Sequence, residues 1–171
     1  MKRYFYAGSE RQELEPDRSV VAVERMTAAN AGLGDALSAV SVKSRLPSGM
    51  VLVSPDELTK KALTDLQQAG ATRTVYRVGH SLVVPMADIR VEFDAEEQKR
   101  ETLAVLKAVP TPVELVEESP ALLLLRPTSG SSEDALDIAN YLHEHGSPAA
   151  ASVRMLHIVS RGLRGSERDT K

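Results

Sequence analysis

Apolar and polar residues of the second half of the chain follow two different periods. Ile89, Val91 and Phe93 are separated by charged residues, and this period of two is typical of a strand with one buried face. An apolar segment typical of a helix follows and ends before Pro110. The pattern predicts strand, helix, strand, strand, helix and strand over residues 89–93, 94–109, 113–118, 121–126, 131–145 and 151–159.

The first half follows the same order more loosely. Two helices share their start and stop signals, a serine followed by acidic residues and a glycine near the end, at Ser54 with Gly70 and at Ser131 with Gly146. The helix expected over 28–40 is weakened by internal glycines. Strands are expected at 20–23, 42–46, 50–54 and 72–78. The chain is therefore predicted to contain an internal repeat.

The composition of these strands agrees with a four-stranded sheet in each half. In a βαββαβ sheet the first and third strands are central and should be apolar throughout, whereas the edge strands should alternate. Residues 20–23, 50–53 and 122–125 fit the central positions, and residues 42–46 and 113–115 fit the edges. We predict an α+β protein of two tandem ferredoxin-like βαββαβ units, with antiparallel sheets and helices on one face.

We place the N-terminal unit at residues 1–80, the C-terminal unit at 81–160 and a flexible tail at 161–171. The N-terminal unit is expected to begin with a hairpin in which Tyr4-Phe5-Tyr6 pairs with Glu13-Leu14-Glu15 around a turn at Gly8. Residues 79–88 are too apolar for a free linker, so we expect the two units to pack together.

Composition and charge narrow the classes of function. The chain has no cysteine, which excludes a disulfide scaffold, a thiolate zinc site and a cysteine nucleophile. Its net charge of −3, with both signs interleaved, gives no reason to expect nucleic acid as a partner. No apolar run of about 18 residues occurs, so we expect no membrane partner, and we interpret the protein as cytoplasmic.

Few side chains form a pattern that supports catalysis. His143 and His145 are two residues apart near a helix end and point away from each other, whereas a metal pair on a helix needs a spacing of three or four. Gly32 and Gly34 lack the spacing of a phosphate loop, and no Gly-x-Ser-x-Gly motif is present. We expect no enzymatic activity, no metal and no cofactor.

The second unit contains a run of four leucines whose side chains need to be buried on both faces of the sheet. Leu122, Leu123, Leu124 and Leu125 place two leucines on each face of the sheet, and helices cover only one face in this fold. The other pair is expected to be buried by the sister unit or by a partner, because an exposed leucine forgoes about 1.5–3 kcal/mol. The sequence leaves both alternatives open.

Several short sequence segments resemble the prodomains of bacterial subtilisin-family serine proteases. They are Tyr4-Phe5-Tyr6, Glu15-Pro16 and Val20–Val23 at the start, and residues 82–85 and 89–93 at the opening of the second half. In that family the open sheet face of the propeptide packs on two helices of the protease, and the segment after its last strand lies in the substrate cleft. The resemblance therefore implies a protein–protein complex.

Carried over by position, the resemblance assigns three sets of residues. It implies a packing face of Leu122 and Leu124 or of Leu123 and Leu125, helix-capping carboxylates at Glu117 and Glu118, and a cleft segment of His157, Ile158, Val159, Ser160 and Arg161. No catalytic domain follows, so we expect an inhibitor or chaperone that acts on a subtilisin-like serine protease in trans. The alternative is a tandem ACT-like regulatory protein that senses a small ligand, since such units share the βαββαβ order.

Overall fold

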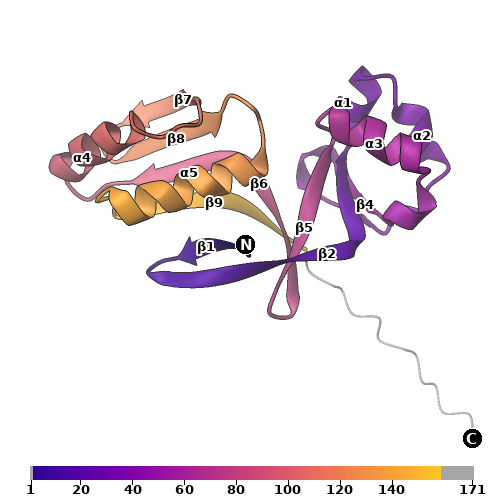
Figure 1. Ribbon diagram of the computed structural model, residues 1–171, viewed down its shortest axis with the longest axis horizontal. Coiled ribbons are helices and arrows are strands. Elements are labelled where there is room, and N and C mark those ends of the chain that lie inside the picture. The colour runs from indigo at the N-terminus through magenta and orange to yellow at the C-terminus, as the bar shows by residue number, and fades with distance from the viewer. Residues whose placement is uncertain (1, 159–171) are drawn as a thin grey trace, which may run out of the picture.

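The computed structural model describes residues 2–158, which form nine strands, five α-helices and two short 3-10 helices. Figure 1 shows their arrangement. In chain order the elements are β1 (Arg3–Ala7), β2 (Glu10–Glu24), α1 (Arg25–Asn30), α2 (Gly34–Ser38), β3 (Ser44–Arg45), η1 (Pro47–Gly49), β4 (Met50–Val53), η2 (Pro55–Glu57), α3 (Lys60–Gln68), β5 (Thr72–Val78), β6 (Ser81–Glu92), α4 (Glu96–Leu106), β7 (Val113–Ser119), β8 (Leu122–Pro127), α5 (Ser132–His145) and β9 (Ala150–Ile158).

All strand pairs among these residues are antiparallel. The strands follow the order β3-β4-β2-β5-β6-β8-β7, with β1 added on β2 and β9 added on β6. The prediction of an α+β fold with antiparallel strands is therefore confirmed.

In the second half, which we call the C-terminal unit, the order from edge to edge is β7-β8-β6-β9. The first and third strands of this unit, β6 and β8, are central, as the apolar run in residues 122–125 predicted. Helices α4 and α5 lie on one face of its sheet (Figure 1).

The first half, or N-terminal unit, has the corresponding order β3-β4-β2-β5. Its first helix is broken: α1 ends at Asn30 and α2 starts at Gly34, with Gly32 in the left-handed region at φ 74° between them. The glycines that weakened the predicted helix over 28–40 thus divide it, because a glycine adopts this conformation without strain.

The second helix of the N-terminal unit starts later than predicted. Ser54 is followed by the short 3-10 turn η2, and the N-cap of α3 is Thr59, whose Oγ1 accepts a hydrogen bond from the Ala62 N–H at 3.1 Å. The capping box predicted at Ser54 is wrong, since its proline starts the tighter turn. Gly70 follows the helix at φ 69°, as expected.

Helix α5 begins as predicted but ends differently. Ser131 caps it by accepting a hydrogen bond from the Asp134 N–H at 3.2 Å. Gly146 at its other end is not left-handed, with φ −89°. Glycine is required there by space, because a Cβ would lie 2.7 Å from the Leu142 carbonyl oxygen.

Pairing of β5 with β6 joins the strands of the two halves into one sheet. The apolar segment 79–88 is the turn and first part of β6, which continues through the strand expected at 89–93, with a register shift between Pro85 and Ile89. The boundary proposed at residue 80 coincides with the tight turn between β5 and β6, where Gly79 has φ 58°.

The predicted N-terminal hairpin is present, with Tyr6 opposite Arg11 and Gly8 in its turn. It lies along the outer side of α5 (Figure 1). Buried Asn140 of α5 donates its Nδ2–H to the Tyr4 carbonyl oxygen at 2.8 Å, and the Glu144 carboxylate accepts from both the Tyr4 and Tyr6 hydroxyls at 2.7 and 3.0 Å. The hairpin thereby ties the beginning of the chain to the last helix.

Candidate protein-binding face

The four leucines of β8 divide cleanly between the two faces of the sheet. Leu123 and Leu125 are buried in the apolar cluster beneath α4 and α5. Leu122 and Leu124 are half-buried on the opposite side. Of the two packing pairs implied by the resemblance, Leu123 and Leu125 belong to the protein's own core, with 0% and 1% of their surface exposed.

We call the side of the C-terminal unit opposite its helices the open face. Strand register places Glu117, Leu124, Arg90 and Ser152 in one row across it. Leu122 and Glu92 form part of the next row. The open face therefore combines two central leucines with charged neighbours, and the leucines are shielded in part by long polar side chains.

A hollow of about 440 Å³ lies on this face next to Leu124. Exposed Val116, at the register shift of β7, forms part of its wall. Its remaining lining residues are Asp88, Arg90, Leu125, Arg126, Ser152 and Arg154. The hollow is apolar at its centre and rich in arginine at its rim.

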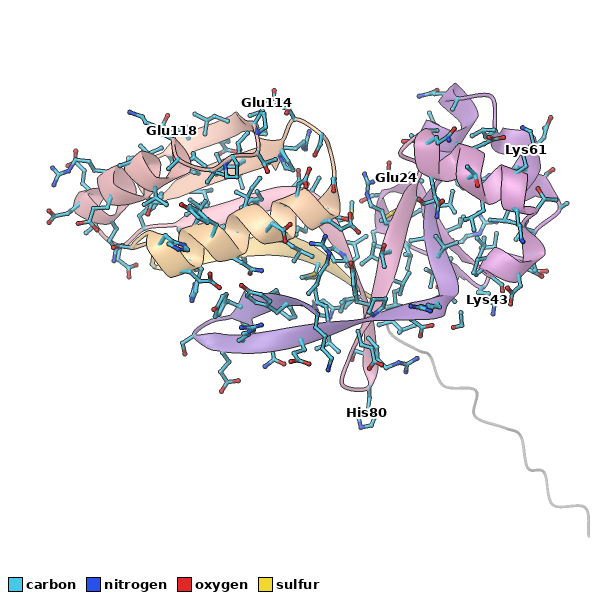
Figure 2. The ribbon with its side chains drawn as sticks, in the orientation of Figure 1. Glu24, Lys43, Lys61, His80, Glu114 and Glu118 are labelled. Atoms are coloured by element: carbon cyan, nitrogen blue, oxygen red, sulfur yellow. The ribbon has the colours of Figure 1, made fainter. Side chains whose placement is uncertain are left out.

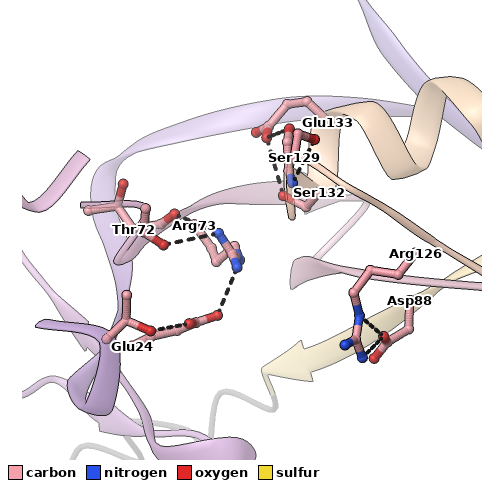
Figure 3. A network of polar contacts seen from close by, with 11 residues as sticks. Glu24, Thr72, Arg73, Asp88, Arg126, Ser129, Ser132 and Glu133 are labelled. Atoms are coloured by element: carbon pink, nitrogen blue, oxygen red, sulfur yellow. Dashed lines mark hydrogen bonds and ion pairs between the residues drawn. The ribbon is translucent and has the colours of Figure 1, made fainter. Parts of the chain in front are cut away.

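Among the described residues, two ion pairs lie on the open face. One joins Arg90 to Glu92, and the other joins Arg126 to Asp88. The Nε and Nη2 atoms of Arg126 lie 3.0 and 2.6 Å from Asp88 Oδ1 (Figure 3). This hydrogen-bonded carboxylate raises the pKa of Arg126 above its ordinary value. Arg154 of β9 has no ion pair within residues 2–158, so its positive charge is available to a partner.

The two carboxylates expected to cap protease helices point to opposite sides of β7. Glu118 lies opposite Leu123, on the helix side, and its Oε1 is 2.7 Å from Nζ of Lys99 in α4. Glu117 lies opposite Leu124 and is exposed on the open face. Only Glu117 is therefore placed beside the half-buried leucines.

The expected cleft segment begins inside the sheet. His157 is an exposed residue of β9, but Ile158 is buried and pairs with Leu82 in β6. The prediction that Ile158 belongs to an extended cleft segment does not match its position, because a buried strand residue is held by the core. Val159, Ser160 and Arg161 lie outside the described residues.

The N-terminal unit also has a sheet face without helices, and this face, unlike the open face, is covered by other residues of the chain. Val84 of β6 and Leu156 and Ile158 of β9 pack against it. Its buried members are Ala22, Met50, Leu52 and Val75. The sister unit thus covers the helix-free face of the N-terminal unit, while the described residues leave the open face uncovered.

A polar junction that the sequence did not signal joins β5 to the start of α5. The Glu133 carboxylate accepts hydrogen bonds from Thr74 Oγ1 and Ser131 Oγ, both at 3.2 Å. Burial opposes ionisation of Glu133, but hydrogen bonds from its own backbone N–H, Thr74 and Ser131 outweigh burial and lower its pKa. Nearby, Arg73 forms a part-buried ion pair with Glu24 at 3.0 Å.

Comparisons with protein-family models, with curated proteins and with solved structures found no match to this chain. Among the helices of residues 2–158, none has the length and apolar character needed to cross a membrane.

Proposed function

We propose that this chain is an inhibitor or chaperone that binds a subtilisin-like serine protease in trans, in the cytoplasm, without enzymatic activity of its own. The open face packs on the protease, and the segment after β9 enters the substrate cleft. We further propose that the two units are tandem ferredoxin-like units, for which the equivalent strand orders of the two halves are the support. The observation that carries the proposal is the uncovered open face with Leu122 and Leu124 at its centre.

The energetics of such a contact favour a docked protein. Completing the burial of two half-buried leucines contributes on the order of 1 kcal/mol each, about half the value for full burial. Glu117, exposed beside them, is suited to the positive N-terminal end of a partner helix. The arginines at the rim supply charge-assisted hydrogen bonds to partner carboxylates or to the carbonyl groups at helix ends.

We propose that Val159, Ser160 and Arg161 enter the cleft, and that His157, exposed on β9, lies near its entrance. A chain bound in a protease cleft adds main-chain hydrogen bonds in the manner of an extra strand. It inhibits when the rest of the interface keeps it from leaving after attack.

The first test measures binding and inhibition of a purified subtilisin-type protease. Leu124→Lys places a charge at the centre of the open face and is expected to weaken binding about tenfold or more, since about 1.4 kcal/mol corresponds to a factor of ten. The matched control is Leu63→Lys, which makes the same change at a half-buried leucine of α3. If both variants bind as the parent does, the open face is not the contact.

The second test separates the cleft segment from the face. A chain that ends at Ile158 keeps all of β9 and should retain its thermal stability and most of its binding to protease with a blocked active site. Its inhibition of the active enzyme should fall strongly. Absence of any binding or inhibition by the parent chain, together with stabilisation by one small metabolite in a thermal-shift screen, would support the ACT-like sensor in its place.

A further inference from the structure

All the strongly exposed large apolar side chains of residues 2–158 gather at two edges of the sheet. Met26 and Val42 are 70% and 42% exposed, and Leu115 and Val116 are 49% and 50% exposed. Val42 precedes edge strand β3, and Leu115 and Val116 lie in edge strand β7. β3 and β7 are the two ends of the strand order, so these two apolar groups lie at opposite ends of that order.

The two edges carry opposite charge. Three exposed cations, Arg25, Lys43 and Arg45, lie in or next to β3 and α1, and β7 carries three exposed acids, Glu114, Glu117 and Glu118. Figure 2 shows Glu114 and Glu118 on the C-terminal unit and Lys43 on the N-terminal unit. We call these sites the basic edge and the acidic edge.

Most of these charges are not neutralised inside the chain. The ion pairs within residues 2–158 include none of the three cations of the basic edge. On the acidic edge Glu118 is paired with Lys99, but Glu114 and Glu117 have no such partner. The cation nearest to Glu114 across the strands, Arg126, is already held by Asp88.

The basic edge also has a hollow. It measures about 440 Å³ and is bordered by Met26 and Val42, with buried Val51 and Val53 among its lining residues and Arg25 and Arg45 at the rim. The hollow lies beside the two short helices into which the first helix of the N-terminal unit is broken, and both helices contribute lining residues. An apolar strand flanked by acids fits this shape and charge.

We propose that the acidic edge of one copy of this chain binds the basic edge of a second copy. In this head-to-tail contact β7 lies against the segment 42–46, with Leu115 or Val116 beside the hollow and Glu114 and Glu117 near Lys43 and Arg45. Edge strands offer free backbone N–H and C=O groups for such pairing. Pairing of two acidic or two basic edges would place like charges opposite each other, which disfavours a symmetric dimer.

The test measures the mass of the purified chain alone by light scattering and sedimentation, from about 10 µM to about 1 mM at low and high salt. The mass is expected to rise above that of one chain with concentration and to return toward it in high salt. A mass of one chain under every condition would overturn the proposal, and would mean that the charges only protect the edges from pairing.

Charge reversal makes the test specific. Lys43→Glu with Arg45→Glu, or Glu114→Lys with Glu117→Lys, should each weaken self-association at least tenfold. An equimolar mixture of the two variants should associate again, because each presents an edge complementary to the other. Failure of the mixture to associate would contradict the edge-to-edge geometry.

The matched control reverses Arg18 and Lys60 to Glu, two exposed cations away from the basic edge, and should leave association within twofold of the parent. Circular dichroism verifies that each variant is folded. Because no protease is present, the outcome is independent of the proposed inhibitory function.

Discussion

The helix-free faces of the two units have the same place in equivalent strand orders but different surroundings. In the N-terminal unit, Leu52 and Met50 are buried against β6 and β9 of the sister unit. In the C-terminal unit, Leu122 and Leu124 stay half-buried among charged residues. The N-terminal face is covered because Val84 of β6 and Leu156 and Ile158 of β9 pack against it.

The helix side shows the opposite asymmetry. The N-terminal hairpin extends β2 and covers the outer side of α5, whereas the broken helix of the N-terminal unit leaves a hollow beside β3. Each unit is therefore completed on one side by residues of the other. The sides left incomplete, the open face and the two sheet edges, are where we expect other molecules to bind.

The largest effect should distinguish the two helix-free faces directly. Leu52→Ala removes a buried side chain from the contact between the units and should lower the free energy of unfolding by about 2–5 kcal/mol. Leu122→Ala, on the open face, should lower it by about 1 kcal/mol or less, because the Leu122 side chain is already partly exposed to solvent and loses less buried area. Chemical denaturation measures both, and equal losses would contradict the difference in coverage.

The next effect concerns the hairpin that covers α5. Asn140→Ala removes the donor to the Tyr4 carbonyl oxygen and should cost about 1–3 kcal/mol, since that oxygen is left without its partner in a part-buried site. Asn30→Ala, at an exposed position of α1, serves as the control and should be close to neutral. A neutral effect of Asn140→Ala would mean that the hairpin contributes little to the stability of the C-terminal unit.

The polar junction between β5 and α5 should make stability depend on pH. The pKa of Glu133 is lowered from 4.5 in the folded protein. The stabilisation of the folded state by ionised Glu133 is therefore complete above pH 4.5 and is lost as pH falls through the lowered pKa. Glu133→Gln should remove this part of the acid dependence in thermal unfolding at different pH. If Glu133→Gln showed the same acid dependence as the parent, this contribution of Glu133 would be contradicted.

The smallest effect is expected on the open face. Asp88 and Arg126 are both partly exposed, at 37% and 48% of their side-chain surface. Arg126→Ala should therefore change the free energy of unfolding by about 0–1 kcal/mol in the free protein. A loss well above this range would contradict the partly exposed position of this ion pair.

The elements that could be predicted from sequence were those with strong local signals. The apolar runs at 50–53 and 122–125 marked central strands, Ser131 marked the start of α5, and the hairpin at Gly8 followed from the residues around it. Ser54 misled because a serine followed by Pro-Asp-Glu is compatible both with an α-helix and with the 3-10 turn that forms. Such ambiguity is settled by packing rather than by the local residues.

The candidate face was predicted only in part. Alternation in residues 122–125 indicates that two leucines lie on each side, but not which pair is buried. The same limit applies to Glu117 and Glu118: their opposite orientations depend on the register shift of β7 against β8. The contact of Glu133 with Thr74 joins residues far apart in the chain and has no local signal.

The sequence by itself determined the periodicity, and with it the α+β class, the βαββαβ order and the central strands of each half, because side-chain spacing depends only on local backbone geometry. The tertiary structure decided which faces and edges remain accessible. That outcome depends on the pairing of β6 with β5 and β9 and on the packing of β6 and β9 against the N-terminal unit. These are contacts between residues far apart in the chain, and no local pattern contains them.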